Sequence, residues 1–173
     1  MRLLLLLPFL FTVGVLADSV AGLHWTAPAG WKNEGARPMR AATYIVAPAS
    51  GDRASAECVV YFFGEGQGGT VDANIERWKG QFRTPDGHPA AAQIAKRTSH
   101  GLTITTIDAS GEYSGMGGPL AGEQRAVSGY RLLGAIVEGP RGNVFVKFTG
   151  PVKTIAANEK KFEQLVATFE PEK

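Results

Sequence analysis

Three glycines, Gly64, Gly66 and Gly69, form the pattern G-x-G-x-x-G between an apolar run and a helix-like segment. In a dinucleotide-binding unit, such glycines let the backbone approach a pyrophosphate at a helix N-terminus. That chemistry also needs a parallel βαβ unit with an acidic residue at the end of its second strand. Asp86 has a suitable separation, but it lies in the turn-like stretch TPDGHP. We therefore interpret the glycines as a flexible connection and predict no bound cofactor.

Polar side chains recur on the helix-like segment after these glycines. Asn74, Arg77 and Gln81 are spaced by three and four residues, so they form one stripe along a helix. The plainer interpretation is a solvated flank of the helix. The alternative is that Asn74 and Arg77 point inward, where they fix neighbouring loops or line a ligand cleft.

A lysine interrupts the apolar run VFVKFTG, in which Phe145 and Thr149 share the face of Lys147. A lysine in such a strand usually extends along the surface until its ammonium group reaches water. The alternative is a cation that faces a pocket or a buried carboxylate, such as Asp108 or Glu112.

Six glycines between Gly111 and Gly129 predict a long, flexible loop. Loops at the edge of a rigid sheet often carry binding residues, so this segment is the leading candidate for a functional element. A connection without a role is the alternative. Its side chains with the capacity for contact are Tyr113, Met116, Leu120, Gln124 and Arg125.

Neither metal binding nor nucleophilic catalysis has a recognisable signature. His24, His88 and His100 are separated in sequence, and no HExxH or paired-cysteine spacing occurs. The pairs Asp86 with His88 and His100 with Asp108 could meet in space. The sequence therefore predicts no metal site.

The single cysteine and the serines give no nucleophile either. Cys58 lies within the apolar run ECVVYFF, which is typical of a buried and inert thiol. Ser114 follows Glu112-Tyr113 rather than standing in G-x-S-x-G, and S-x-x-K is absent. We predict no catalytic residue.

The elements that position these residues follow from periodicity and turn signals. Short apolar runs joined by polar turns indicate antiparallel hairpins. Two segments have helical periodicity, one beginning after Thr70 and ending at Thr84-Pro85, and one at the end of the chain. Residues 90–97 are also compatible with a helix. The expected strands are 23–25, 40–48, 55–63, 92–99, 102–109, 130–138 and 143–150. The expected apolar helix positions are Val71, Ile75, Trp78 and Phe82, and then Ile155, Phe162, Val166 and Phe169.

These elements predict an α+β fold: an antiparallel sheet of about seven strands with two amphipathic helices packed on it, on one face or on opposite faces. The strand at 55–63 is apolar on both faces and is therefore expected at the centre of the sheet.

The N-terminus predicts export. Arg2 precedes an apolar run to Leu16 that is shorter than the ~20 residues of a membrane span, and small residues follow it. Residues 1–21 are thus expected to be a signal peptide cleaved after Ala17 or Ala21, with a single domain at 22–173. The absence of a disulfide framework favours a bacterial periplasmic or secreted protein. The formal net charge of +2, with both signs interspersed, predicts no nucleic-acid partner and no membrane insertion after cleavage.

The stretch LHWTAPAGWK, the long hairpins and VFVKFTGP before the final helix resemble the PsbP-like superfamily, an α/β sandwich. More narrowly, GGTVDANIERWKGQF, GEYSG and YRLLGAIVEGPRGNVFVKFTGP are similar to a group of exported, uncharacterised bacterial proteins with that fold. The resemblance covers most of 23–169 and implies no conserved catalytic apparatus. It implies an exported, non-enzymatic binding or accessory protein with an unknown protein or small-molecule partner. The alternatives are a hydrolase or other enzyme with a site under the Gly111–Gly129 loop, and a structural envelope protein.

Overall fold

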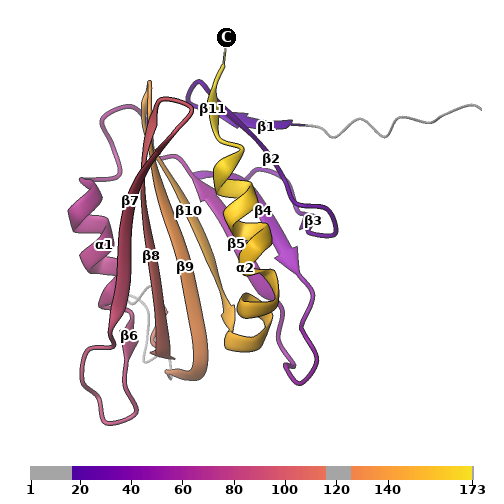
Figure 1. The fold of residues 1–173 in the computed structure, drawn as a ribbon, viewed down its shortest axis with the longest axis vertical. Helices are drawn as coiled ribbons and strands as arrows, with labels where there is room; N and C mark the ends of the chain where they lie inside the picture. Colours follow the sequence, from indigo (N-terminus) through magenta and orange to yellow (C-terminus); the bar gives the residue numbers. More distant parts are fainter. Residues whose placement is uncertain (1–16, 116–125, 173) are drawn as a thin grey trace, which may run out of the picture.

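The computed structural model describes residues 17–115 and 126–172, and in this part the chain forms two antiparallel sheets and two helices (Figure 1). The larger sheet has the order β3-β4-β5-β10-β9-β8-β6, and β7 also pairs with β8. The smaller sheet has the order β1-β2-β11. The strands of the larger sheet are β3 (Lys32–Asn33), β4 (Arg40–Val46), β5 (Ala56–Tyr61), β6 (Phe82–Arg83), β7 (Ala92–Ser99), β8 (Leu102–Tyr113), β9 (Val127–Gly139) and β10 (Gly142–Pro151). Those of the smaller sheet are β1 (Ala17–Val20), β2 (Leu23–Thr26) and β11 (Glu170–Pro171), and the helices are α1 (Val71–Lys79) and α2 (Val152–Ala167).

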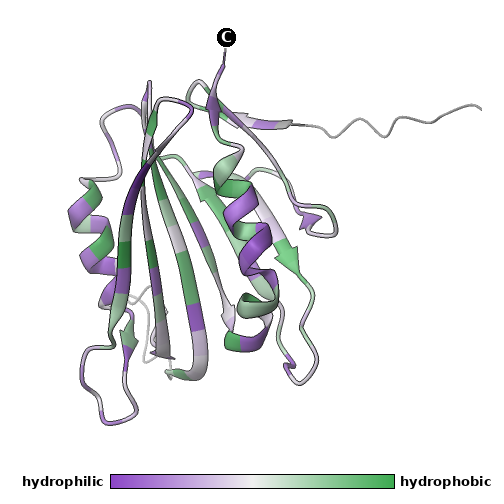
Figure 2. Ribbon diagram, in the orientation of Figure 1, coloured by the Kyte–Doolittle hydropathy of each residue, from purple (hydrophilic) through white to green (hydrophobic). Residues whose placement is uncertain are grey.

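The two helices cover opposite faces of the larger sheet. Because side chains alternate along a strand, one strand can serve two cores. In β10, Val144, Val146 and Phe148 belong to the core under α2, whereas Phe145 belongs to the core under α1. Both helices carry hydrophobic and hydrophilic bands in Figure 2, as amphipathic helices do. The predicted α+β fold is therefore confirmed, with the helices on opposite faces.

Helix α1 is shorter than its periodicity suggests. The side chain of Thr70 accepts a hydrogen bond from the Ala73 amide at 3.2 Å, which confirms the predicted N-cap. The helix ends at Lys79, not at Thr84-Pro85. Phe82, predicted on its apolar stripe, lies on β6 instead, opposite Tyr113. It is still fully buried in the core under α1.

The hairpin of β7 and β8 is confirmed, with Ser99 opposite Leu102, and the helical alternative for residues 90–97 is wrong. The predicted loop at 111–129 is shorter than expected. β8 extends to Tyr113 and β9 begins at Val127, so the strands take in both ends of that segment.

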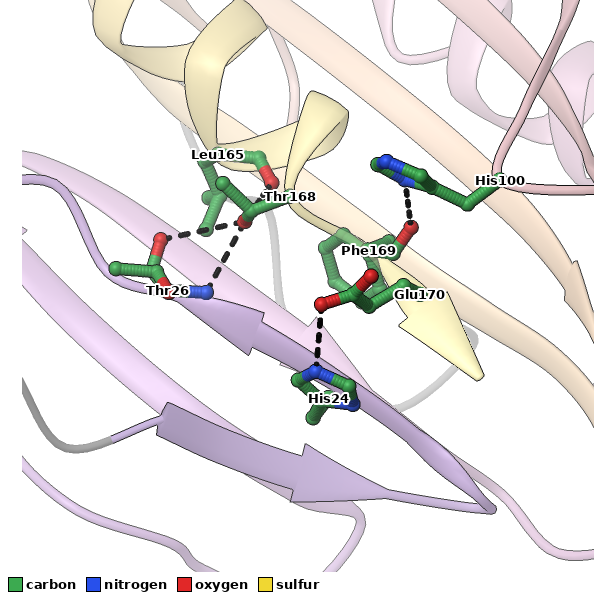
Figure 3. A network of polar contacts seen from close by, with 7 residues as sticks. All are labelled: His24, Thr26, His100, Leu165, Thr168, Phe169 and Glu170. Atoms are coloured by element: carbon green, nitrogen blue, oxygen red, sulfur yellow. Dashed lines mark hydrogen bonds and ion pairs between the residues drawn. The ribbon is translucent and has the colours of Figure 1, made fainter. Parts of the chain in front are cut away.

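The C-terminal segment closes the core under α2. Phe169, predicted on the helix, lies just beyond it and stacks on Trp25 at a centroid distance of 5.0 Å. Figure 3 shows the polar contacts around Phe169 at the end of α2. His100 Nδ1 lies 3.1 Å from the Phe169 carbonyl oxygen, and His24 Nε2 lies 2.8 Å from Glu170 Oε1. In the described part of the chain, neither helix has the length and apolar composition needed to cross a membrane.

Candidate functional site

A cavity of about 630 Å³ lies beside α1, on the face of the sheet that this helix only partly covers. Nine residues of helix cannot cover strands of up to 13 residues, so part of the sheet face stays open. A second cavity of about 460 Å³ adjoins it and shares Arg40, Tyr61, Gly115 and Lys147 with it. We call the two cavities together the α1 cleft. The main side chains of its first cavity are Met39, Arg40, Tyr61, Phe63, Arg77, Trp78, Gln81, Phe145 and Lys147.

Lys147 lies at the base of the cleft and is only 5% exposed. Its Nζ donates hydrogen bonds to Gln81 Oε1 at 2.6 Å and to the Tyr113 hydroxyl at 3.2 Å. Burial lowers the pKa of Lys147 to about 8, and the nearby positive charge of Arg77 contributes in the same direction. The interpretation of Lys147 as a surface lysine is therefore wrong, because its ammonium group faces a pocket.

The carboxylates suggested as partners for Lys147 are engaged elsewhere. Asp108 forms an ion pair with Arg131 at 2.6 Å, and Glu112 accepts a hydrogen bond from Ser128 at 3.2 Å. Within residues 17–115 and 126–172, no carboxylate oxygen lies within 4.0 Å of the Lys147 ammonium. Lys147 thus has two neutral partners and no counter-charge in the described part of the chain.

Asn74 and Arg77 both agree with the inward interpretation, but Asn74 is buried whereas Arg77 lines the cleft with an exposed side chain. Asn74 is 1% exposed, and its Nδ2 donates to the carbonyl oxygens of Gly68 and Thr70, both at 2.8 Å. Arg77 donates to Asn74 Oδ1 and lines the cleft, although its side chain is exposed. The solvated-flank interpretation is wrong for Asn74 and for Gln81, which are both buried. Asn74 fixes the glycine-containing loop before α1.

The glycines of that loop allow a close approach to aromatic rings. A Cβ atom on Gly68, which has φ +88°, would lie 2.8 Å from the Phe145 ring and 2.9 Å from the Phe63 ring. Gly68 is not one of the three glycines of the G-x-G-x-x-G pattern. The loop therefore turns tightly over the edge of the cleft, and steric packing accounts for this glycine.

Tyr113 and Gln81 connect the end of β8 to the segment after α1. The Ser114 amide donates to the Gln81 carbonyl oxygen at 3.0 Å, and the Lys147 ammonium lies 5.4 Å from the centre of the Tyr113 ring. Burial raises the pKa of Tyr113 to about 12, which keeps its hydroxyl protonated at neutral pH. The other predicted contact residues of this segment, Met116, Leu120, Gln124 and Arg125, lie outside the described residues.

Sequence reasoning missed the wall of the cleft opposite α1. Arg40 forms an ion pair with Glu57 and lies 5.6 Å from the centre of the Tyr61 ring. Met39 has a positive φ of 65° and is 65% exposed at the cleft. The available signal was Tyr61 and Phe63 at alternate positions, which place two aromatic rings on one face of the sheet.

Two histidine pairings suggested by the sequence have different outcomes. His88 Nε2 lies 3.6 Å from Asp86 Oδ2 on an exposed turn, so this pair does meet. His100 contacts the Phe169 carbonyl, and Asp108 is paired with Arg131. Neither pairing involves the α1 cleft.

The cleft brings Lys147, Tyr113, Gln81 and Arg77 together. An enzyme needs at least two titratable groups within hydrogen-bond reach in a concave pocket. Lys147 and Tyr113 meet this geometric condition. The same arrangement can also hold a ligand without reacting with it, because a buried ammonium, a guanidinium and a phenol are all hydrogen-bond donors.

Comparison with known proteins supports the fold. No protein-family model and no curated protein matches the chain. The solution structure of PsbP (CyanoP) from Synechocystis sp. PCC 6803 matches with a TM-score of 0.53 and 12% identity, over 92% of this chain and 95% of that chain. The crystal structure of PA94, a Pseudomonas aeruginosa protein of unknown function, matches with a TM-score of 0.52 and 14% identity, over 91% of this chain and 97% of that chain. This chain has a PsbP-like fold.

Proposed function

We propose that this chain is an exported, non-enzymatic accessory protein that binds a small ligand in the α1 cleft. The observation that carries the proposal is a cavity of about 630 Å³ with aromatic walls and a few convergent polar groups. Ligand sites typically have this size and this mixture of groups. Export rests on the signal-like N-terminus and places the protein in the bacterial periplasm or outside the cell. Two of the structural neighbours are named as a PsbP protein and as a protein of unknown function.

A structural envelope protein without a ligand predicts no sizeable cavity, so the α1 cleft argues against that alternative. A purely structural role would also not explain why a lysine is buried at position 147, because a lysine stabilises a sheet core less well than an apolar side chain.

The proposal is tested by thermal-shift screening of the purified protein against a library of small metabolites. A ligand of the cleft should raise the melting temperature in a concentration-dependent way. Tyr61→Ala should abolish the shift because it removes one aromatic wall, whereas Ile94→Ala, an exposed site on β7, should retain it. The absence of any stabilising compound, or a shift that survives in Tyr61→Ala, would contradict the proposal.

An enzyme that uses the same cleft is the second candidate, and the Lys147–Tyr113 pair favours it. An amine whose pKa is about 8 can exchange protons near neutral pH, and the adjacent phenol can donate one. The test is hydrolysis of generic ester, amide and phosphate substrates by the wild type, Lys147→Met and Tyr113→Phe. Turnover that both variants lose would support the enzyme, and the absence of turnover in the wild type would exclude these reactions.

A further inference from the structure

Lys147 is a buried cation that lacks a counter-charge in the described part of the chain. An ammonium group has three donors, and the structure supplies acceptors for two of them, Gln81 Oε1 and the Tyr113 hydroxyl. Removing a cation from water is energetically unfavourable unless an opposite charge compensates. Two neutral partners offset only part of that cost. A bound anion would accept a hydrogen bond from the third N–H donor and would balance the positive charge of Lys147.

Other partly buried cations of the protein are paired with carboxylates. Arg131 contacts both Asp108 and Glu159, at 2.6 and 2.9 Å. Arg40 is paired with Glu57. The fold therefore supplies counter-charges to these two cations, including Arg40, which itself lines the α1 cleft, whereas Lys147 has none in the described part of the chain.

A second cation, Arg77, faces the same cavity. Its side-chain hydrogen bond in the described part of the chain goes to Asn74 Oδ1, an amide oxygen without charge. The described lining of the first cavity contains Arg40, Arg77 and Lys147 but no carboxylate. Neither Lys147 nor Arg77 has a counter-ion in the described part of the chain, which makes this cavity electropositive and favours anions over neutral or cationic ligands.

The remainder of that cavity is apolar and aromatic. The rings of Tyr61, Phe63, Trp78 and Phe145 surround the open space beside Lys147. A small hydrated anion such as chloride would make no apolar contact with these rings. An organic anion satisfies both parts, because its head group neutralises the cations while its body covers the aromatic wall.

We propose that the α1 cleft binds a small organic anion whose carboxylate or phosphate group accepts hydrogen bonds from Lys147 and Arg77 and whose apolar body packs on the partly exposed rings of Tyr61 and Phe63. This inference rests on the proposed binding function and names the chemical class of its ligand.

The test compares acids with neutral molecules of the same shape. 4-Phenylbutyrate and 4-phenylbutyramide are titrated against the wild type, Lys147→Met and the control Lys96→Met, whose lysine is exposed on β7. Phenyl phosphate is a third probe that separates phosphate from carboxylate head groups. In the wild type and in Lys96→Met, the acid should bind at least tenfold more tightly than the amide, as expected for hydrogen bonds to a charged group. In Lys147→Met this preference should fall by about threefold or more, with the remainder due to Arg77 and with binding of the amide retained.

A second measurement does not depend on the folding of a variant. In wild-type protein with 13C-labelled lysine, 4-phenylbutyrate should raise the pKa of Lys147 from its lowered value, whereas the amide should leave it unchanged. Equal affinities for acid and amide would overturn the anion inference and leave the binding function standing. An unchanged Lys147 titration with bound acid would also overturn it. If neither the acids nor the amide binds, this ligand class is wrong, and the metabolite screen decides separately whether the cleft binds another one.

Discussion

At position 147 of β10, burial of an apolar side chain would cost less free energy than burial of the lysine. Its cross-strand neighbours are Val59 on β5 and Gly134 on β9, so its side chain rises from the centre of the sheet. Phe145, two residues away on the same face, is fully packed in the core under α1. Residues that reduce stability in this way are often those that contact ligands, because binding requires a group that folding alone does not favour.

The lowered pKa of Lys147 predicts a specific dependence of stability on pH. Below about pH 8 the lysine is charged in both the folded and the unfolded chain, and its burial penalty is fully present. Between pH 8 and the unfolded value of 10.5 the unfolded chain binds more protons, so stability rises with pH. Relative to Lys147→Met, the wild type should therefore gain about 2 kcal/mol of unfolding free energy between pH 7 and pH 10.

Urea unfolding of both proteins at the two pH values measures this gain. Other groups also titrate in this range, including Tyr61 and Tyr113, whose pKa values burial raises. The difference between the two proteins largely removes their contribution, because both proteins carry them. The exposed control Lys96→Met should show no such change relative to the wild type, and a constant difference between wild type and Lys147→Met would refute the buried-charge account.

At the scale of elements, α1 depends on Asn74 for its connection to the sheet. Asn74→Ala removes the donors to two backbone carbonyls and the acceptor for Arg77, and should cost about 1–3 kcal/mol of unfolding free energy. Hydrogen exchange of the α1 amides should accelerate as well, because the preceding loop loses its anchor. The exposed control on the same helix, Glu76→Ala, should change stability by less than about 0.5 kcal/mol. Unaltered stability in Asn74→Ala would show that the loop does not need this anchor.

The packing of α1 on the sheet makes a second prediction, at Gly134. A Cβ atom there would lie 2.5 Å from Trp78 Cζ3 and 2.8 Å from Ile107 Cγ2, so the indole occupies the space of a missing side chain. Gly134→Ala should displace α1 and cost about 1–3 kcal/mol.

A double-mutant cycle with Trp78→Leu tests this contact, with chemical unfolding as the measurement. Because the smaller side chain relieves the overlap, Gly134→Ala should cost less than half as much in the Trp78→Leu background. If Gly134→Ala costs the same unfolding free energy in both backgrounds, its destabilisation does not come from contact with the Trp78 indole.

The elements were predictable from the sequence where local periodicity decides them. The near-continuous apolar run at 55–63 indicates a strand covered on both faces, and the structure places β5 between β4 and β10. Phe82 and Phe169 were misassigned because each stands one helical step after a true apolar helix position, and periodicity alone cannot show that the helix has already ended.

The site was less predictable, because its contacts join distant parts of the chain. Lys147 and Gln81 are 66 residues apart, and nothing near Lys147 in the sequence indicates an amide partner. Asn74 and Arg77 were identifiable as a stripe, but only tertiary packing decides which side of a short helix is buried.

At the scale of the whole molecule, both ends of the described chain meet in the small sheet. β2 pairs with β1 on one side and with β11 on the other, so the end of α2 is tied to the start of the domain. Ala21 and Gly22, both with positive φ, form the tight turn between β1 and β2. The N-terminal strand is therefore part of the fold, and its retention matters for stability.

If the N-terminal segment is a signal peptide, as the sequence predicts, this arrangement favours cleavage after Ala17 over cleavage after Ala21. Cleavage after Ala17 retains Asp18, which accepts hydrogen bonds from the buried Tyr44 hydroxyl and, at 3.4 Å, from Asn33 Nδ2. Cleavage after Ala21 would cut within the turn and remove β1 entirely. The intact mass of the exported protein should therefore correspond to a chain that begins at Asp18.

Purified chains that begin at Asp18 and at Gly22 provide the matched comparison. The shorter chain leaves the Tyr44 hydroxyl without its acceptor and should melt roughly 2–10 °C lower. Asp18→Asn in the longer chain isolates the carboxylate from the strand, and it should account for only part of that loss because the backbone pairing of β1 with β2 remains. A mature mass that begins at Gly22, or equal melting temperatures of the two chains, would show that β1 is dispensable and that the domain begins at β2.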